Sequence, residues 1–135
     1  MRTTIKTTSL ILILSFLICL NLSAQQAYQV DGENEAKVVM YYFHFNARCA
    51  TCRAIESKAQ LNVKELFGND VSFTACNLDK PEGESKGKEL GINSQALLVV
   101  KGDKKINLIK EGFMYARTNP EKFKQIIEEK IKPLL

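Results

Sequence analysis

The sequence has few of the side chains that hold metal ions. It contains one histidine, His44, and its only pair of closely spaced cysteines is Cys49 and Cys52. A structural zinc site takes four ligands, and no second such pair or second histidine completes the set. The sequence therefore disfavours structural zinc, and we expect neither a resident metal nor a cofactor.

The sequence also lacks a large excess of either charge. It holds 19 Lys and Arg residues against 15 Asp and Glu residues, a net charge of +4. Arg2 and Lys6 lie in a predicted leader, and removing them leaves a net charge of about +2. A balance this small does not indicate nucleic-acid binding, and we expect no such partner.

The first 24 residues have the pattern of a signal peptide. Two positive residues precede an apolar run over residues 10–20, and Ala24 ends a plausible cleavage tripeptide. The run is short for a membrane span, although an uncleaved N-terminal anchor is the alternative. Ile18 is too large for a lipid-attachment signal at Cys19, so we assign Cys19 to the leader.

Removal of the leader leaves about 111 residues, the usual size of one domain. We expect a flexible lead-in over residues 25–36 and one domain over residues 37–135. The leader predicts export across the inner membrane to the periplasm, with membrane attachment only if it is uncleaved. A disulfide persists outside the cytosol, so Cys49 and Cys52 could form either a structural or a catalytic one. Cys76 is then left over.

The hydrophobic pattern predicts an α/β domain. We expect strands over 37–45, 71–78, 96–100 and 105–110, and helices over 49–67, 84–90 and from a capping box at Thr118 and Glu121 to Pro133. Right-handed crossovers would make the first three strands parallel, with helices on both faces. The last strand pairs back as a hairpin, which gives a central mixed sheet of about four strands flanked by helices.

The run Cys49-Ala50-Thr51-Cys52 lies where the first strand gives way to an amphipathic helix. Free backbone N–H groups at a helix start favour a thiolate at Cys49. Cys52 lies one turn on, close enough to form a disulfide with Cys49 or to resolve a mixed one. A disulfide across so short a loop adds little stability through chain entropy, which favours a redox role over a structural one.

With these residues the chain resembles the thioredoxin family over nearly all of the sequence that follows the predicted leader. Besides the two cysteines, the similar landmarks are Asn77-Leu78-Asp79, Leu90-Gly91-Ile92 and Gly112. The resemblance implies a thioredoxin-like fold and thiol–disulfide oxidoreductase activity. It also implies that Cys49 is the nucleophile and Cys52 the resolving thiol.

The sequence departs from that family at several positions. Arg48 replaces a tryptophan, Phe43 a buried aspartate and Ala75 its lysine partner. Ala96 replaces a cis-proline that faces the dithiol in the family. A cis bond without proline costs about 3 kcal/mol, so we expect a trans Gln95–Ala96 bond. Gln95 and Ala96 would then line a differently shaped substrate groove, and generic disulfides should be reduced slowly.

Other residues have two interpretations each. His44 is either an acid–base group for thiol exchange or a buried, hydrogen-bonded strand residue. Arg48, like Arg53, either favours a Cys49 thiolate or faces solvent. Glu56 either replaces the missing aspartate or faces solvent. Cys76 is interpreted as a small core residue, with a partnership with Cys49 as the alternative.

The neighbouring aromatic residues are interpreted as core rather than as a ligand cage, and they are Tyr41, Tyr42, Phe43 and Phe45.

The sequence therefore predicts an exported, monomeric thiol–disulfide oxidoreductase that exchanges electrons with protein disulfides or dithiols. A redox partner that recycles it is also expected. Two alternatives remain open: a binding module with a vestigial dithiol, and a protein that handles zinc or copper(I) through Cys49, Cys52 and His44.

Overall fold

The computed structural model describes residues 37–135. The strands are β1 (Val38–His44), β2 (Val71–Asn77), β3 (Ala96–Lys101) and β4 (Lys104–Asn107), and the helices are α2 (Ala50–Phe67), α3 (Pro81–Leu90), α4 (Ile109–Tyr115), α5 (Pro120–Ile131) and the short 3-10 helix η1 (Lys132–Leu134). Within these residues no helix combines the length and apolar character needed to cross a bilayer. The predicted signal peptide and lead-in lie outside the described residues.

The strands form one mixed sheet in the order β2-β1-β3-β4, which confirms the predicted α/β fold with four strands flanked by helices. β1 and β2 are parallel, with Val38 opposite Val71 and His44 opposite Asn77. β3 runs antiparallel to β1, and its first residue, Ala96, lies opposite Phe43. The expectation of three parallel strands was therefore wrong.

The length of α3 explains the reversal. α2 has 18 residues and carries the chain back along the full sheet, so β2 runs parallel to β1. α3 has only 10 residues, about 15 Å, and its first turn stays beside the end of β2, where an added Cβ at Gly83 would lie 2.0 Å from the Asn77 carbonyl oxygen. The chain thus enters β3 from the edge at which β1 ends.

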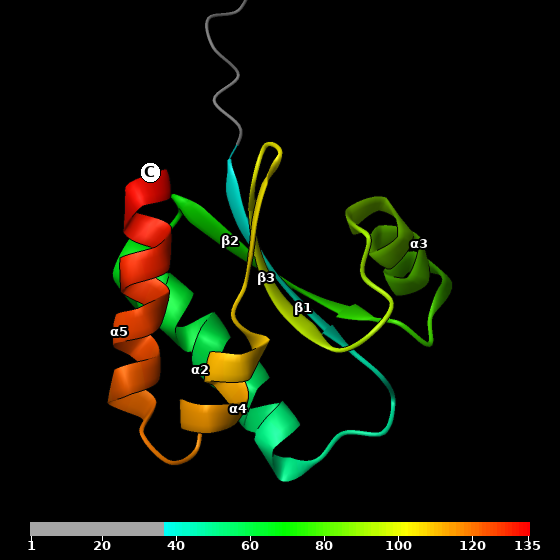
Figure 1. The fold of residues 1–135 in the computed structure, drawn as a ribbon, viewed down its shortest axis with the longest axis horizontal. Helices are drawn as coiled ribbons and strands as arrows, with labels where there is room; N and C mark the ends of the chain where they lie inside the picture. Colours follow the sequence, from blue (N-terminus) through cyan, green and yellow to red (C-terminus); the bar gives the residue numbers. More distant parts are fainter. Residues whose placement is uncertain (1–36) are drawn as a thin grey trace, which may run out of the picture. The chain divides into compact units, whose positions relative to one another are not determined.

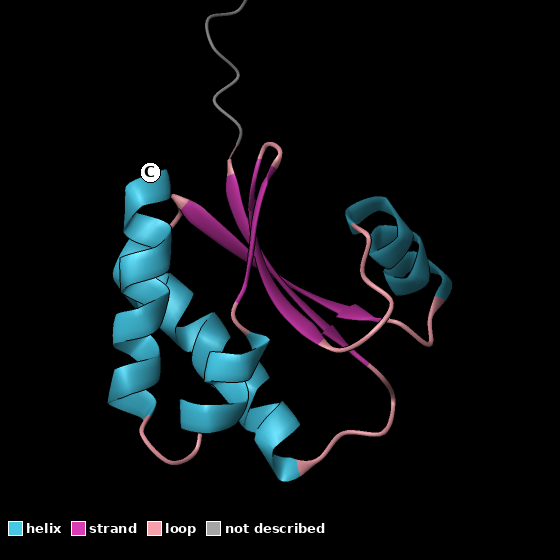
Figure 2. Cartoon of the chain, in the orientation of Figure 1, coloured by secondary structure: helices cyan, strands magenta, loops and turns pink. Residues whose placement is uncertain are grey.

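Helices cover both faces of the sheet (Figures 1 and 2). On one face, α2 and α5 pack over the larger core, whose fully buried members include Met40, Tyr42, Ile55, Phe123 and Ile127. On the other face, α3 lies over a smaller core of Phe43, Cys76, Ala96 and Leu98. The dithiol helix and Cys76 therefore belong to opposite faces.

The chain after β3 differs from the predicted strand over residues 105–110. β4 ends at Asn107, whose side-chain oxygen accepts hydrogen bonds from Ile109 N (3.1 Å) and Leu97 N (3.3 Å). These contacts turn the chain into α4, a helix that the hydrophobic pattern of the sequence did not predict. Local side-chain capping of this kind competes with continued strand pairing.

The predicted capping box at Thr118 was also wrong. Asn119 caps α5, because its side chain accepts a hydrogen bond from Lys122 N (3.1 Å). Thr118 instead donates its hydroxyl proton to the Met114 carbonyl (2.5 Å), at the end of α4. Its side chain is therefore engaged by the preceding helix and cannot cap the following one.

Candidate functional site

The two cysteines lie at the start of α2, as predicted. Cys49 is the N-cap residue, with extended backbone (φ −75°, ψ 169°), and its sulfur accepts a hydrogen bond from Cys52 N (3.1 Å). The first turn of α2 contains no acidic residue, so no carboxylate offsets the positive end of the helix dipole there. This position favours negative charge on the Cys49 sulfur in the reduced protein.

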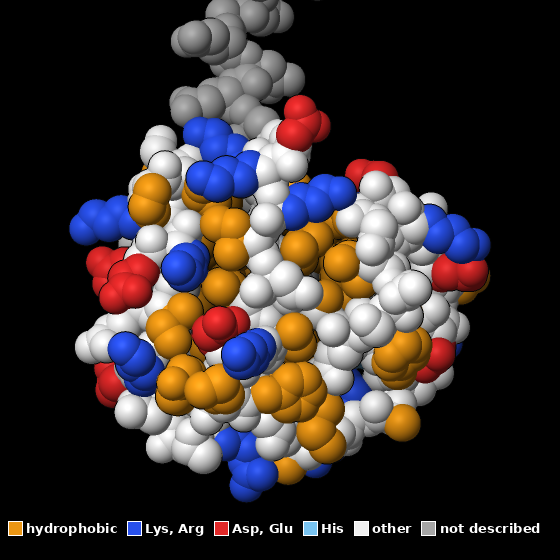
Figure 3. Space-filling model, in the orientation of Figure 1, with side chains coloured by type: hydrophobic (Ala, Val, Ile, Leu, Met, Phe, Trp, Pro, Cys, Tyr) orange, Lys and Arg blue, Asp and Glu red, His pale blue; other side chains and the backbone are white. Residues whose placement is uncertain are grey.

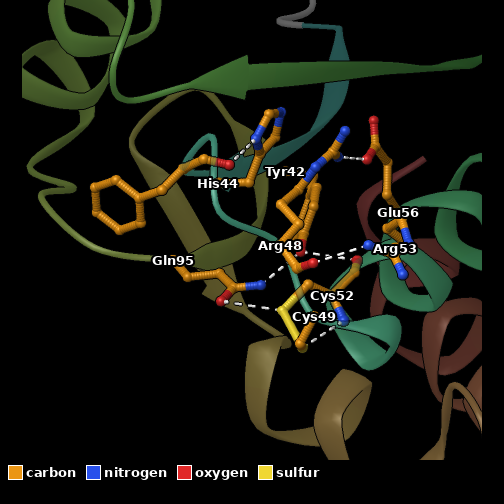
Figure 4. Close-up of a disulfide and its surroundings, with 9 residues drawn as sticks. Tyr42, His44, Arg48, Cys49, Cys52, Arg53, Glu56 and Gln95 are labelled. Atoms are coloured by element: carbon orange, nitrogen blue, oxygen red, sulfur yellow. Dashed lines mark hydrogen bonds and ion pairs between the residues drawn. A yellow bond between two sulfur atoms is a disulfide. The ribbon is translucent and has the colours of Figure 1, made fainter.

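Cys49 and Cys52 are joined by a disulfide, with their Cα atoms 5.1 Å apart (Figure 4). The two cysteines differ in accessibility, since Cys49 is an exposed residue and Cys52 is only 7 % exposed. An incoming thiol or disulfide therefore meets Cys49 first.

A hydrogen-bonded chain connects Cys52 to β1 and to the residue before β3 (Figure 4). The Tyr42 hydroxyl donates to the Cys52 carbonyl oxygen (2.9 Å) and accepts from Gln95 Nε2 (2.5 Å). The other end of the same carboxamide, Gln95 Oε1, lies 3.9 Å from Cys52 Sγ. Burial raises the pKa of the Tyr42 phenol, against smaller opposite effects of Gln95 and Arg48, so Tyr42 remains a neutral donor.

Tyr42 was interpreted only as core material, and this role was missed. It is fully buried, as predicted, but a buried phenol also needs a partner for its hydroxyl group. That requirement was the available signal, although the sequence could not show which partner it finds.

Arg48 and Glu56 form an ion pair on the surface beside the dithiol, and each side chain is more than two-thirds buried. The interpretation that both simply face solvent was therefore wrong for this pair. The neighbouring Arg53 is exposed and donates to the Arg48 carbonyl oxygen (2.8 Å), which ties the loop to the first turn of α2. A role of Glu56 as a proton acceptor stays a prediction.

His44 is buried at the end of β1. Its Nδ1 donates to the Phe45 carbonyl oxygen (3.0 Å), and its ring stacks on Tyr42 with centroids 5.7 Å apart. The interpretation as a buried, hydrogen-bonded strand residue is confirmed, and an acid–base role stays a prediction. Phe45, expected in the core, is 39 % exposed because β1 ends at His44.

A second polar network fixes the loop that leads to Cys49, and it includes Asn46, a residue that was not predicted from the sequence. Asn46 N donates to Asp79 Oδ2 (2.6 Å), and Asn77 Nδ2 donates to Asn46 Oδ1 (2.8 Å). Leu78 N donates to the His44 carbonyl oxygen (2.7 Å). The Asn77-Leu78-Asp79 landmark therefore anchors the loop between β1 and α2.

The Gln95–Ala96 peptide bond is trans, as predicted. The Ala96 side chain is 1 % exposed and packs with Phe43 and Leu98, on the α3 face. Ala96 is thus unavailable to a substrate, and of the two predicted groove residues only the half-buried Gln95 can line a groove. Gln95 and Cys52 are close to each other, whereas the Ala96 methyl group points into the smaller core.

Gly112 lies in α4 and packs against α2. A Cβ there would come within 3.1 Å of two carbon atoms of the Ile55 side chain, one turn after Cys52. The next residues, Phe113 and Met114, are each 46 % exposed, and hydrophobic side chains gather over α4 in the space-filling view (Figure 3).

Cys76 is a free, buried thiol in the smaller core, which confirms its interpretation as a core residue. Burial raises the pKa of its thiol, and the charge of Lys86 acts in the opposite direction. Among residues 37–135 no group of three His, Cys, Asp or Glu side chains is placed to hold a metal ion, so Cys49, Cys52 and His44 do not form a ready set of ligands.

No protein-family model matches the chain, and no curated protein matches it in sequence. Among solved structures, the chain is distantly similar to Fasciola hepatica thioredoxin (20 % identity, TM-score 0.46, 71 % of this chain and 83 % of that one). Chlamydomonas reinhardtii thioredoxin f2 matches at 17 % identity and a TM-score of 0.42, over 65 % of this chain and 84 % of its own. A malarial protein matches at 18 % identity and a TM-score of 0.41, over 51 % of this chain and 74 % of its own. At these values the similarities assign neither a family nor an activity to the chain.

Proposed function

We propose that the protein is a thiol–disulfide oxidoreductase that exchanges electrons with protein disulfides through Cys49 and Cys52. The observation that carries the proposal is the unequal placement of the two sulfurs. Cys49 is exposed and caps α2, whereas Cys52 is buried and bonded to it. A purely structural disulfide does not require one of its two cysteines to be exposed at the positive end of a helix.

The reaction follows from this arrangement. The reduced Cys49 thiolate attacks one sulfur of a client disulfide, a bond forms between them, and the other client sulfur departs as a thiolate. Cys52 then attacks Cys49 Sγ, forms the intramolecular disulfide and releases the second client sulfur, which takes up the proton that Cys52 loses. Two electrons pass from the dithiol to the client, and the reverse sequence oxidises a client dithiol.

The leader pattern supports the further proposal that the protein is exported to the periplasm, where we propose that it works as a monomer. Disulfide clients are plentiful there, and a second redox protein would restore the starting state of the dithiol. The exposed Phe113 and Met114 on α4 offer apolar contact area to an unfolded or extended client.

A single-turnover experiment with insulin tests the proposal. The reduced full chain is mixed with an equal amount of insulin, the reaction is quenched with an alkylating agent, and each cysteine is assigned by peptide mass mapping. We expect formation of the Cys49–Cys52 disulfide in step with loss of insulin disulfides. Full retention of both reduced thiols with intact insulin, together with no oxidation of reduced insulin by the disulfide form of the chain, would instead support a binding module with a vestigial dithiol.

A further inference from the structure

The Tyr42 hydroxyl group has one proton, and its two neighbours determine which of them accepts the hydrogen bond. The Cys52 carbonyl oxygen can only accept, so Tyr42 must donate its proton there (2.9 Å). Towards Gln95, Tyr42 can then act only as an acceptor, and the group that faces it must be the Gln95 amide nitrogen (2.5 Å). The carboxamide orientation is therefore fixed by the hydrogen-bond network itself.

This orientation determines what Cys52 meets. With Nε2 held by Tyr42, the carboxamide turns its oxygen towards Cys52 Sγ, 3.9 Å away. In the disulfide that sulfur carries no hydrogen, and the contact is a simple approach of two atoms. After reduction the Cys52 thiol has a proton to donate, and Gln95 Oε1 is an acceptor that has no proton to give.

We propose that Gln95, oriented by Tyr42, is a positioning residue that holds Cys52 as a protonated thiol in the reduced protein. The inference rests on the proposed function, because it concerns the second thiol of the same reaction. An acceptor beside Cys52 stabilises S–H over S⁻, while the N-cap position of Cys49 favours the thiolate. The pair therefore begins a cycle with its negative charge on Cys49, the exposed residue of the two.

The hydrogen bond also orders the two steps. Cys52 stays protonated until the mixed disulfide has formed, and its proton then passes to the departing client sulfur, so Gln95 retains none of it. The interaction exists only in the reduced protein and stabilises that state relative to the disulfide.

The charged and titratable side chains around the network come from β1, the following loop and the first turns of α2. They are Tyr42, His44, Arg48, Arg53 and Glu56. Arg48 and Glu56 neutralise each other, and Arg53 is exposed. From α4, Gly112 packs against Ile55 of α2, and the adjacent Glu111 is the acidic residue of that helix, with its Oε2 buried and without a hydrogen-bond partner among residues 37–135.

The test measures alkylation of Cys52 by iodoacetamide as a function of pH, in the full chain with Cys49→Ala, with the modified cysteine identified by peptide mass mapping. Gln95→Met keeps the length of the side chain and removes the acceptor. Tyr42→Phe frees the carboxamide to turn its N–H groups to the sulfur. Tyr41→Phe is the matched control, since Tyr41 is adjacent on β1 and belongs to the opposite core.

We expect Gln95→Met and Tyr42→Phe to move the midpoint of the profile to lower pH, so that Cys52 reacts about fivefold faster near neutral pH, the effect of one ordinary hydrogen bond. Tyr41→Phe should leave the midpoint unchanged. A change of access alone would scale the rate at every pH without moving the midpoint. The double variant should shift no further than Gln95→Met, because both changes remove the same interaction.

A midpoint in Gln95→Met equal to that of Tyr41→Phe would overturn the proposal. A shift in Gln95→Met but none in Tyr42→Phe would overturn the part assigned to Tyr42. If Tyr42→Phe fails to fold, Gln95→Met at a half-buried loop position still decides the main claim. The experiment contains no client disulfide, so its outcome is independent of the insulin reaction, which tests the proposed function.

Discussion

Gln95 and Cys52 are separated by 43 positions in the sequence, yet Gln95 Oε1 lies 3.9 Å from Cys52 Sγ. The direction of β3 creates this relationship. Because β3 runs antiparallel to β1, its first residue lies opposite Phe43, near the end of β1 from which the chain continues to α2. A parallel β3 would have placed Gln95 at the far edge of the sheet.

Cys49 should be the more reactive thiol of the reduced protein. It is exposed and caps α2, whereas Cys52 is buried, so limiting alkylation at mildly acidic pH should label Cys49 at least about tenfold faster. Peptide mass mapping of the labelled full chain measures the ratio. Preferential labelling of Cys52 would contradict the assignment of Cys49 as the attacking thiol.

Cys52→Ser should accumulate mixed disulfides between Cys49 and client proteins, because the intermediate has lost its resolving thiol. Cys49→Ser should accumulate few, since Cys52 is only 7 % exposed and meets clients poorly. Non-reducing electrophoresis of each variant after incubation with oxidised client protein measures the trapped species. The two-step exchange fails if neither variant traps clients under conditions in which the wild-type chain turns over.

The local part of this site could be predicted from the sequence, and the long-range part could not. The strand, the helix and the two cysteines lie within one stretch, where hydrophobic periodicity and helix termini are visible. The direction of β3 depends on the edge of the sheet at which the chain emerges from α3. The Gln95–Tyr42 hydrogen bond joins residues 53 positions apart. No local pattern carries that information, so Gln95 was assigned to a substrate groove and Tyr42 to the core.

Gly83→Ala should destabilise the fold by about 2–3 kcal/mol, as overpacking typically does. An added Cβ would lie 2.0 Å from the Asn77 carbonyl oxygen, a backbone atom that cannot move without disturbing β2. Ser85→Ala, at an exposed position of the same helix, should change stability little. Urea unfolding of both variants measures the difference, and equal midpoints would show that α3 does not pack this tightly.

The free energy of unfolding should fall as the pH rises above about 9, because of Cys76. Burial raises the pKa of its thiol above the ordinary value of 9.0. At pH values between 9.0 and the raised pKa of the folded state, the unfolded chain has lost the proton that the folded chain keeps, so rising pH favours unfolding. Below the ordinary value both states are protonated and the contribution of Cys76 is constant.

The measurement compares Cys76 with Cys76→Ala in chains that also carry Cys49→Ser and Cys52→Ser, which prevents disulfide exchange in the unfolded state. Urea unfolding at increasing alkaline pH should show a shallower loss of stability in Cys76→Ala. Tyr42 adds a loss above its own ordinary value of 10.0, and this loss is shared by both chains. Parallel curves between about 9 and 10 would contradict the buried environment of the Cys76 thiol.

Equilibration with glutathione tests most directly whether Cys49 and Cys52 form an exchanging pair. The full chain is incubated over a wide range of ratios of reduced to oxidised glutathione, and the fraction of Cys49–Cys52 disulfide is measured after rapid acid quenching and alkylation. We predict complete and reversible conversion within the accessible range, with the dependence of a two-electron couple. A disulfide that resists reduction at every glutathione ratio would be a structural staple and would contradict the account.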